Sequence, residues 1–220
     1  MRSGGSVLTT DDRSTLPRVS RHISIVVLAA GRSSRMLSGT RHKLLATFDG
    51  IPLIRRLVQR ALASKADQVF VVTGHQGGKI KSALDGLAVT FVDNPNFGTG
   101  IASSLKVGLS VAAAAQTHAI MVLHGDMPSI NTRHLDLLID EFESNGNAVV
   151  WATCRGTRGN PVVLPSSIAT EASQLSGDTG AKSLIQSSGF QIVPVEIGLA
   201  ALNDVDTEEQ LLAAGGRLSE

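Results

Sequence analysis

Residues 23–36 read ISIVVLAAGRSSRM, and Lys43 follows shortly after them. The first half of this stretch is an almost unbroken apolar run rich in β-branched side chains, which is typical of a strand buried on both faces of a parallel sheet. The second half is a loop of small residues that carries Arg32 and Arg35. Small side chains let the backbone approach a phosphate closely, and successive backbone N–H groups can surround an anion. The stretch therefore predicts a buried strand that ends in a phosphate-binding loop.

The composition of the chain argues against several other classes of protein. Its 220 residues are 42% hydrophobic and 18% charged, with a formal net charge of +1. This balance gives no reason to expect nucleic acid or an acidic membrane surface as a partner. The single cysteine, Cys154, fits a reducing compartment, and no apolar run is long enough for a membrane helix. We therefore expect a cytoplasmic protein in which residues 1–21 form a flexible tail and residues 22–220 form one domain.

Strand-like and helix-like segments alternate after the opening stretch. Further strands are predicted at residues 68–72, 89–92, 119–123, 148–153, 161–164 and 191–195. Helices are predicted at residues 79–84, 101–115, 166–175 and 181–187, and in the segments that begin at Pro52, Asn131 and Thr207. This alternation predicts an α/β protein, a three-layer α/β/α sandwich around a mostly parallel sheet. Right-handed crossovers would bring the ends of the strands to one edge, where open α/β sheets bind ligands.

Several polar side chains stand at the predicted strand ends. Asp126 follows the strand at 119–123 closely, and Mg²⁺ binds through few carboxylates together with waters and substrate phosphates, so Asp126 is a candidate magnesium ligand. His75 and His124 also lie at strand ends, where a lone histidine is more often satisfied by the protein or turned to solvent. Ser103 and Ser104 lie near a helix start, where helix capping is the default explanation.

A series of motifs extends over about residues 23–214. They are LAAGRSSRM at 28–36 with KLL at 43–45, TGH at 73–75, NP at 94–95 with GIASSL at 100–105, GDMP at 125–128, RGNP at 158–161, GDTGAK at 177–182 and DVDT at 204–207. This series resembles the signature of the MobA-like nucleotidyltransferases and, within them, the MocA-type molybdenum cofactor cytidylyltransferases. The resemblance implies a Rossmann-like nucleotidyltransferase fold with a mixed sheet.

The resemblance also implies roles for individual residues. The nucleotide would be bound by Leu28, Ala29, Ala30, Gly31, Arg32, Ser33, Lys43, Gly74, His75, Ser103 and Ser104. The second substrate would be bound by Asn160, Asp178 and Gly180. Asp126 would coordinate Mg²⁺, for which Mn²⁺ can substitute, with Asp206 as a second ligand, and Arg35, Lys43 and Asp126 would be catalytic. Ala30 stands where guanylyl-transferring relatives tend to carry glycine, which favours CTP over GTP.

The implied reaction is transfer of CMP from CTP to the terminal phosphate of molybdopterin or Mo-molybdopterin, with release of pyrophosphate. Residues 37–42 lengthen the approach to Lys43, so Arg41 could share its role, and His124 replaces an apolar residue that the resemblance leads us to expect. Three alternatives stay open. They are a guanylyltransferase on the same cofactor, a nucleotidyltransferase on a sugar phosphate or other small phosphorylated metabolite, and a non-catalytic chaperone that delivers the cofactor to a recipient molybdoenzyme.

Overall fold

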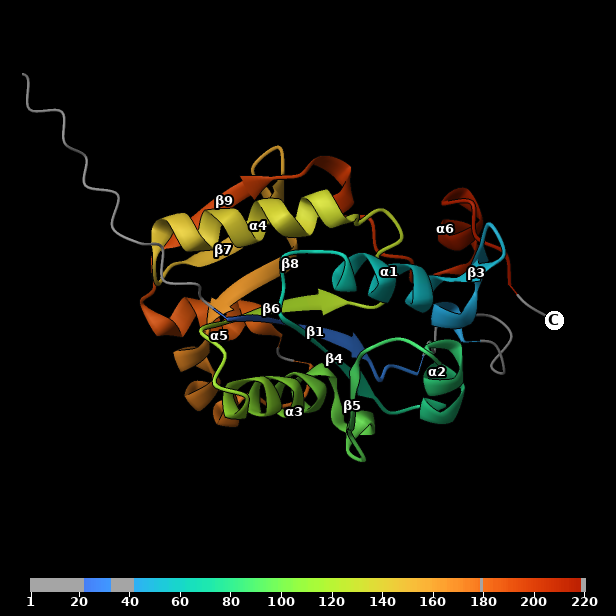
Figure 1. Cartoon of the computed structure of the whole chain (residues 1–220), viewed down its shortest axis with the longest axis horizontal. Coiled ribbons are helices and arrows are strands. Elements are labelled where there is room, and N and C mark those ends of the chain that lie inside the picture. The colour runs from blue at the N-terminus through green and yellow to red at the C-terminus, as the bar shows by residue number, and fades with distance from the viewer. Residues whose placement is uncertain (1–21, 33–41, 179, 219–220) are drawn as a thin grey trace, which may run out of the picture.

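The computed structural model describes residues 22–32, 42–178 and 180–218. Predictions about residues 1–21 and about Ser33, Arg35 and Arg41 lie outside these ranges. A seven-stranded mixed sheet runs through the molecule with helices on both of its faces (Figure 1). The predicted α/β/α sandwich is therefore confirmed. None of the helices in the described ranges has the length and apolar character needed to cross a lipid bilayer.

The sheet has the strand order β5-β4-β1-β6-β8-β7-β9. Its strands are β1 (Ile23–Ala29), β4 (Gln68–Thr73), β5 (Thr90–Asp93), β6 (Ala119–His124), β7 (Val149–Cys154), β8 (Thr157–Pro165) and β9 (Ile192–Glu196). β1 lies between β4 and β6 and pairs in parallel with both. β8 runs antiparallel to its two neighbours, β6 and β7, which makes the sheet mixed.

The helices bury both faces of the sheet. Helices α1 (Leu53–Leu62), α2 (Gly77–Ala83) and α4 (Thr132–Asn145) cover the face that carries Ile25 and Val27 of β1. Helices α3 (Ile101–Ala114) and α5 (Ala181–Ser188), with the 3-10 helix η3 (Ser166–Gln174), cover the face that carries Val26. Successive side chains of a strand point to opposite faces, so β1 must be apolar at nearly every position. This explains the unbroken apolar run.

Helix α3 packs very closely on β1. A Cβ added to Gly108 would lie 2.4 Å from Cγ1 of Val26 and 3.1 Å from Cγ2 of Val72. Only glycine therefore allows the helix axis to approach the sheet this closely. At the start of α3, Ile101 and Ser104 line the same cavity as Leu28 and Ala30 at the end of β1.

Some local structure differs from the prediction. Part of the predicted connection at 46–50 lies in β2 (Thr47–Phe48), which pairs with β3 (Ile51–Pro52) in a short hairpin. Pro52, predicted to open the helix, is instead its N-cap and a member of β3. The helix predicted at 79–84 begins earlier, at Gly77, because Gln76 takes a left-handed conformation with φ of 51° and turns the chain there. The helix predicted at 166–175 is a 3-10 helix.

Candidate active site

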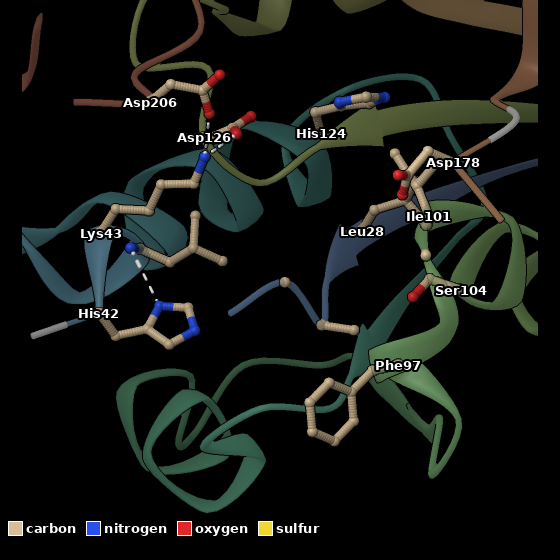
Figure 2. A pocket seen from close by; sticks show the side chains of 14 residues that line it. Leu28, His42, Lys43, Phe97, Ile101, Ser104, His124, Asp126, Asp178 and Asp206 are labelled. Carbon is tan, nitrogen blue, oxygen red and sulfur yellow. Dashed lines mark hydrogen bonds and ion pairs between the residues drawn. The ribbon is translucent and has the colours of Figure 1, made fainter. Parts of the chain in front are cut away.

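A cavity of about 340 Å³ opens at the carboxyl ends of β1 and β6 (Figure 2). Its walls come from segments that are far apart in the sequence. The lining residues are Leu28, Ala30, Gly31, His42, Lys43, Leu44, Phe97, Gly100, Ile101, Ser104, His124, Asp126, Asp178 and Asp206. This is the edge at which open α/β sheets bind ligands.

The ammonium group of Lys43 lies between two carboxylates in this cavity (Figure 2). Its Nζ donates to Oδ2 of Asp126 at 2.5 Å and to Oδ1 of Asp206 at 2.8 Å. The side chains of Lys43 and Asp126 are only 13% and 16% exposed. Burial alone lowers the pKa of Lys43, but Asp126 and then Asp206 outweigh burial and raise the pKa above its usual value. Lys43 is therefore a stable cation at neutral pH.

Asp126 is positioned by the turn that follows β6. The N–H of Gly125 donates to the carbonyl of Leu28 at 3.0 Å, which ties this turn to the end of β1. A Cβ on Gly125 would lie only 2.9 Å from that carbonyl oxygen. Glycine is therefore required for the carboxylate to stand this close to the loop that follows β1. The carbonyl of Asp126 in turn accepts from the N–H of Val205 at 3.0 Å.

Asp206 is positioned by the start of helix α6 (Glu208–Ala213). Thr207 is the N-cap, and its side chain accepts from the backbone N–H of Gln210 in a capping box. The side-chain oxygen of Gln210 also accepts from the N–H of Asp206 at 2.8 Å. The capping box predicted from the spacing of Thr207 and Gln210 is confirmed, and it holds Asp206 toward the cavity.

Aromatic side chains pack beside the cavity. The rings of His42 and His75 stack with centroids 6.1 Å apart, and the ring of Phe97 lies 6.0 Å from that of His75. The guanidinium of Arg32 lies over Phe97, 5.4 Å from the ring centroid. Burial, and then the neighbouring His75, lowers the pKa of His42 from 6.5 to about 4. His42 is therefore neutral at pH 7.

Eight of the predicted site residues line this cavity, and others lie outside its lining. Leu28, Ala30, Gly31, Lys43, Ser104, Asp126, Asp178 and Asp206 line the cavity, whereas Ala29, Arg32, Gly74, His75 and Ser103 are not in its lining. The side chain of Ala29 packs in the core on the α1 side of the sheet. Gly74 has a packing role, because a Cβ there would lie 2.7 Å from Cβ of Phe97. Ser33 and Arg35 lie outside the described residues.

The helix-capping explanation for Ser103 and Ser104 is wrong. The N-cap of α3 is Gly100, which has a φ of 107°, and no side chain caps this helix. Both serine hydroxyls instead accept from the amide Nδ2 of Asn94, at 2.9 Å and 3.0 Å. Asn94 thus anchors the first turn of α3, and Ser104 also faces the cavity.

A second cavity of about 290 Å³ adjoins the first and shares Leu28, Ile101 and His124 with it. The predicted second-substrate residues Asn160 and Gly180 line it, together with the side chains of Trp151, Arg158 and Lys182. The guanidinium of Arg158 lies 5.2 Å from the centroid of the Trp151 ring. Arg158 and Lys182 belong to the loops at 158–161 and 178–182, which the resemblance implied would face the second substrate. Sequence reasoning missed Trp151, which lies in β7 and belongs to no motif.

His124 stands where the two cavities meet. Its ring projects into the space between Asp126 and Ile101 in Figure 2, and no hydrogen bond joins its side chain to another described residue. Sequence reasoning favoured a satisfied or solvent-facing histidine at this position. A half-buried ring that lines two cavities fits the solvent-facing alternative.

Asp126 and Asp206, here called the acidic pair, are suited to bind a divalent cation. Oδ1 of Asp126 is buried and has no hydrogen-bond partner within the described part of the chain. In that same part, no group of three or more His, Cys, Asp or Glu side chains is arranged to hold a metal ion. Two carboxylates without a third ligand suit Mg²⁺, which keeps waters and substrate phosphates in its coordination shell.

The fold and the site place the chain among α/β proteins with a mixed sheet and a polar cavity at the carboxyl edge of that sheet. Comparison with known families makes the assignment narrower. Residues 25–193 match the MobA-like NTP transferase domain, and the chain belongs to this family.

Individual relatives share a third or less of their aligned residues with this chain. The chain is 33% identical over 131 residues to the bifunctional protein GlmU of Coxiella burnetii, a match that covers 59% of this chain and 28% of GlmU. The chain thus corresponds to less than a third of that relative. A nucleotidyl transferase from Methanothermobacter thermautotroptrophicus superposes with a TM-score of 0.75 at 25% identity, over 88% of this chain and 96% of the other.

A further structure supports the fold alone. CMP:2-keto-3-deoxy-manno-octonic acid synthetase in complex with CTP superposes with a TM-score of 0.69 at 17% identity. The superposition covers 87% of this chain and 96% of the synthetase. The Rossmann-like nucleotidyltransferase fold that the motifs implied is therefore confirmed.

Proposed function

We propose that this chain is a Mg²⁺-dependent nucleotidyltransferase that transfers CMP from CTP to the terminal phosphate of molybdopterin or Mo-molybdopterin. The observation that carries the proposal is the Lys43 ammonium between Asp126 and Asp206 at the mouth of a cavity in a MobA-like domain. A cation beside two carboxylates at this edge suits the triphosphate of a nucleotide and its metal ion. The choice of CTP rests on Ala30, and a protein of the same fold has been solved with CTP.

The reaction needs positioning and charge stabilisation more than covalent chemistry. An oxygen of the acceptor phosphate forms a bond to the α-phosphorus of CTP while the bond to the β-phosphate oxygen breaks, and pyrophosphate leaves. Lys43 neutralises negative charge that develops on the α-phosphate and on pyrophosphate. Asp126 and Asp206 would hold the magnesium ion, which would supply positive charge where negative charge develops. Arg35, which lies outside the described residues, is assigned the same kind of role by the resemblance.

The second cavity is the proposed acceptor site. Its apolar floor of Leu105, Val122 and Val162 and the indole of Trp151 suit a flat ring system, and Arg158 and Lys182 suit negative charge. A molybdopterin-type acceptor has both properties. Because the two cavities share Leu28, Ile101 and His124, an acceptor phosphate in one can reach a nucleotide in the other.

Pyrophosphate release is the decisive assay. We expect release with CTP and Mg²⁺ only when molybdopterin or Mo-molybdopterin is present, and weaker release with GTP, ATP or UTP. Preference for GTP would convert the proposal to a guanylyltransferase. Turnover with a sugar phosphate but not with molybdopterin would show that the acceptor substrate is a sugar phosphate. Binding of the cofactor without release of pyrophosphate from any nucleotide would favour a delivery chaperone and contradict the enzyme.

Substitution of the central residues tests the assignment of the site. Lys43→Ala and Asp126→Asn should each lower kcat by about 100-fold or more, because one lost charge-stabilising contact costs about 3 kcal/mol in the transition state. Lys81→Ala is a matched control, since Lys81 pairs with Asp93 at 2.8 Å on the surface. The control should keep full activity. Unchanged turnover in Lys43→Ala would remove the basis of the mechanism.

A further inference from the structure

His42 is a buried histidine that the proposed reaction does not use. It is only 4% exposed. Its Nδ1 accepts from the backbone N–H of Leu44 at 3.3 Å, which caps the short 3-10 helix η1 (Lys43–Leu45). Its carbonyl accepts from the N–H of Leu45 at 2.8 Å. His42 thus determines the backbone geometry of the turn from which Lys43 projects.

The other side of the ring faces the segment that follows β1. The His42 ring stacks on His75 with an interplanar angle of 18°, and the N–H of His75 donates to the carbonyl of Ala30 at 3.1 Å. The carbonyl of Gly31 also acts on the ring and favours its protonated form, although burial has the larger and opposite effect on the pKa. His42 therefore connects the residues that follow β1 to the turn that carries Lys43.

The state of the imidazole is determined by these contacts. Because Nδ1 is an acceptor, the neutral ring must carry its proton on Nε2. Nε2 is buried and has no hydrogen-bond partner in the described part of the chain. A buried N–H without a well-formed hydrogen bond is unfavourable, so a small movement of Gly31 that completes the bond would be favoured.

We propose that His42 is a positioning residue for nucleotide binding, in which its Nε2–H joins the Gly31 carbonyl to the turn that carries Lys43. This inference rests on the proposed function. When a nucleotide binds beside Gly31, the Nε2–H bond to the Gly31 carbonyl is completed, and the direction of the Lys43 side chain is set at the same time. The ring of His42 lines the cavity, but its Nε2 is buried, so this nitrogen acts through Gly31 and the turn that carries Lys43.

Kinetics of two variants test this role. His42→Phe keeps a flat ring that can stack on His75 but loses both nitrogens, and should lower kcat/KM for the nucleotide at least tenfold. His42→Gln keeps a neutral amide with a donor and an acceptor, and should recover part of the loss. His118→Phe is the matched control, because His118 also stacks on a histidine, 6.2 Å from His22, and its Nδ1 also accepts a backbone N–H. The control should stay within twofold of the wild type.

A second measurement separates positioning from a role in folding alone. Nitrogen NMR of the wild-type histidines should report His42 as the Nε2–H tautomer, with a downfield shift of this proton when Mg²⁺ and CTP are added. Thermal unfolding of each variant identifies any loss of fold. Normal kcat/KM in His42→Phe, or an Nε2 signal unmoved by bound nucleotide, would overturn the inference alone. No turnover of any nucleotide by the wild type would contradict the proposed function, and the inference would fall with it.

Discussion

Lys43 has an electrostatic role before any ligand arrives. It keeps the carboxylates of Asp126 and Asp206 close together, since each accepts from the same Nζ. Without that ammonium, two partly buried carboxylates face one another and repel, which is unfavourable in a region of low dielectric. The lysine and a divalent cation are thus two sources of positive charge for one acidic pair.

Removal of the Lys43 ammonium should make the stability of the protein depend more strongly on a divalent cation. We expect Lys43→Ala to be less stable to urea than the wild type by about 2 kcal/mol in the absence of divalent ions. Millimolar Mg²⁺ should restore more stability to the variant than to the wild type, because the free acidic pair gains more from the ion. Lys43→Ala combined with Asp126→Asn should lose this magnesium response. An equal response in all three proteins would argue against a divalent site at Asp126.

The pKa of His42 predicts a dependence of stability on pH. Burial first, and then His75, Lys43 and Lys79, lower the pKa to about 4 from 6.5, while the Gly31 carbonyl opposes them. Between these values the unfolded chain binds a proton that the folded chain does not. The free energy of unfolding therefore falls as the pH falls from 6.5 to 4, with a contribution of about 3 kcal/mol from this group. Urea titrations at pH 7 and 4.5 should show a smaller loss in His42→Gln than in the wild type, and parallel losses would contradict the prediction.

At the scale of elements, helices α4 and α6 both begin with a capping box, but only the box of α6 lies beside the cavity. Thr207 caps α6 next to Asp206, and Asn131 caps α4, each through a capping box with the residue three positions on. The box at α6 lies next to the acidic pair, because Gln210 also binds the N–H of Asp206. The Asn131 box instead holds the start of a helix that covers the sheet.

These two caps form a matched pair of variants. Thr207→Ala and Asn131→Ala should each lower stability by about 1 kcal/mol, the usual cost of losing an N-cap. Only Thr207→Ala should also lower nucleotidyl transfer, by severalfold, because it loosens Asp206. Melting temperatures and rates of pyrophosphate release measure the two effects. Equal rates for both variants would show that Asp206 needs no support from α6.

At the scale of the whole molecule, the candidate site depends on segments separated by most of the chain. Gly31 follows β1, Lys43 opens η1, Asp126 follows β6 and Asp206 precedes α6, and all four line one cavity. Figure 2 shows Lys43, Asp126 and Asp206 there. A ligand that contacts all four should therefore stabilise the complete fold against unfolding.

This expectation is measurable without an acceptor substrate. A hundredfold excess of Mg·CTP over its Kd should raise the free energy of unfolding by about 2.7 kcal/mol, because the ligand binds only the folded state. Calorimetry should show a higher melting temperature with Mg·CTP than with either component alone. Chelation of the metal should abolish the added stability. A melting temperature that does not change when Mg·CTP is added would contradict a nucleotide site in this cavity.

Much of the site could be anticipated from local sequence. Leu28, Ala30, Gly31 and Asp126 stand at or just after strand ends, and strand ends of a parallel sheet meet at one edge. The apolar run of β1 indicated burial on both faces, and the spacing of Thr207 and Gln210 indicated a cap. These features depend on neighbours within a few residues, so the sequence pattern carries them.

Long-range packing decided the rest. The pairing of Lys43 with Asp206 joins residues 163 positions apart, and no local pattern encodes which lysine meets which carboxylate. The close packing of Gly74 against Phe97 and the position of His124 in the lining of both cavities also depend on segments that are distant in the sequence. The low pKa of His42 also arises from burial against residues of other segments. Periodicity and turn chemistry are local properties, whereas burial, electrostatic pairing and cavity shape exist only once distant segments pack together.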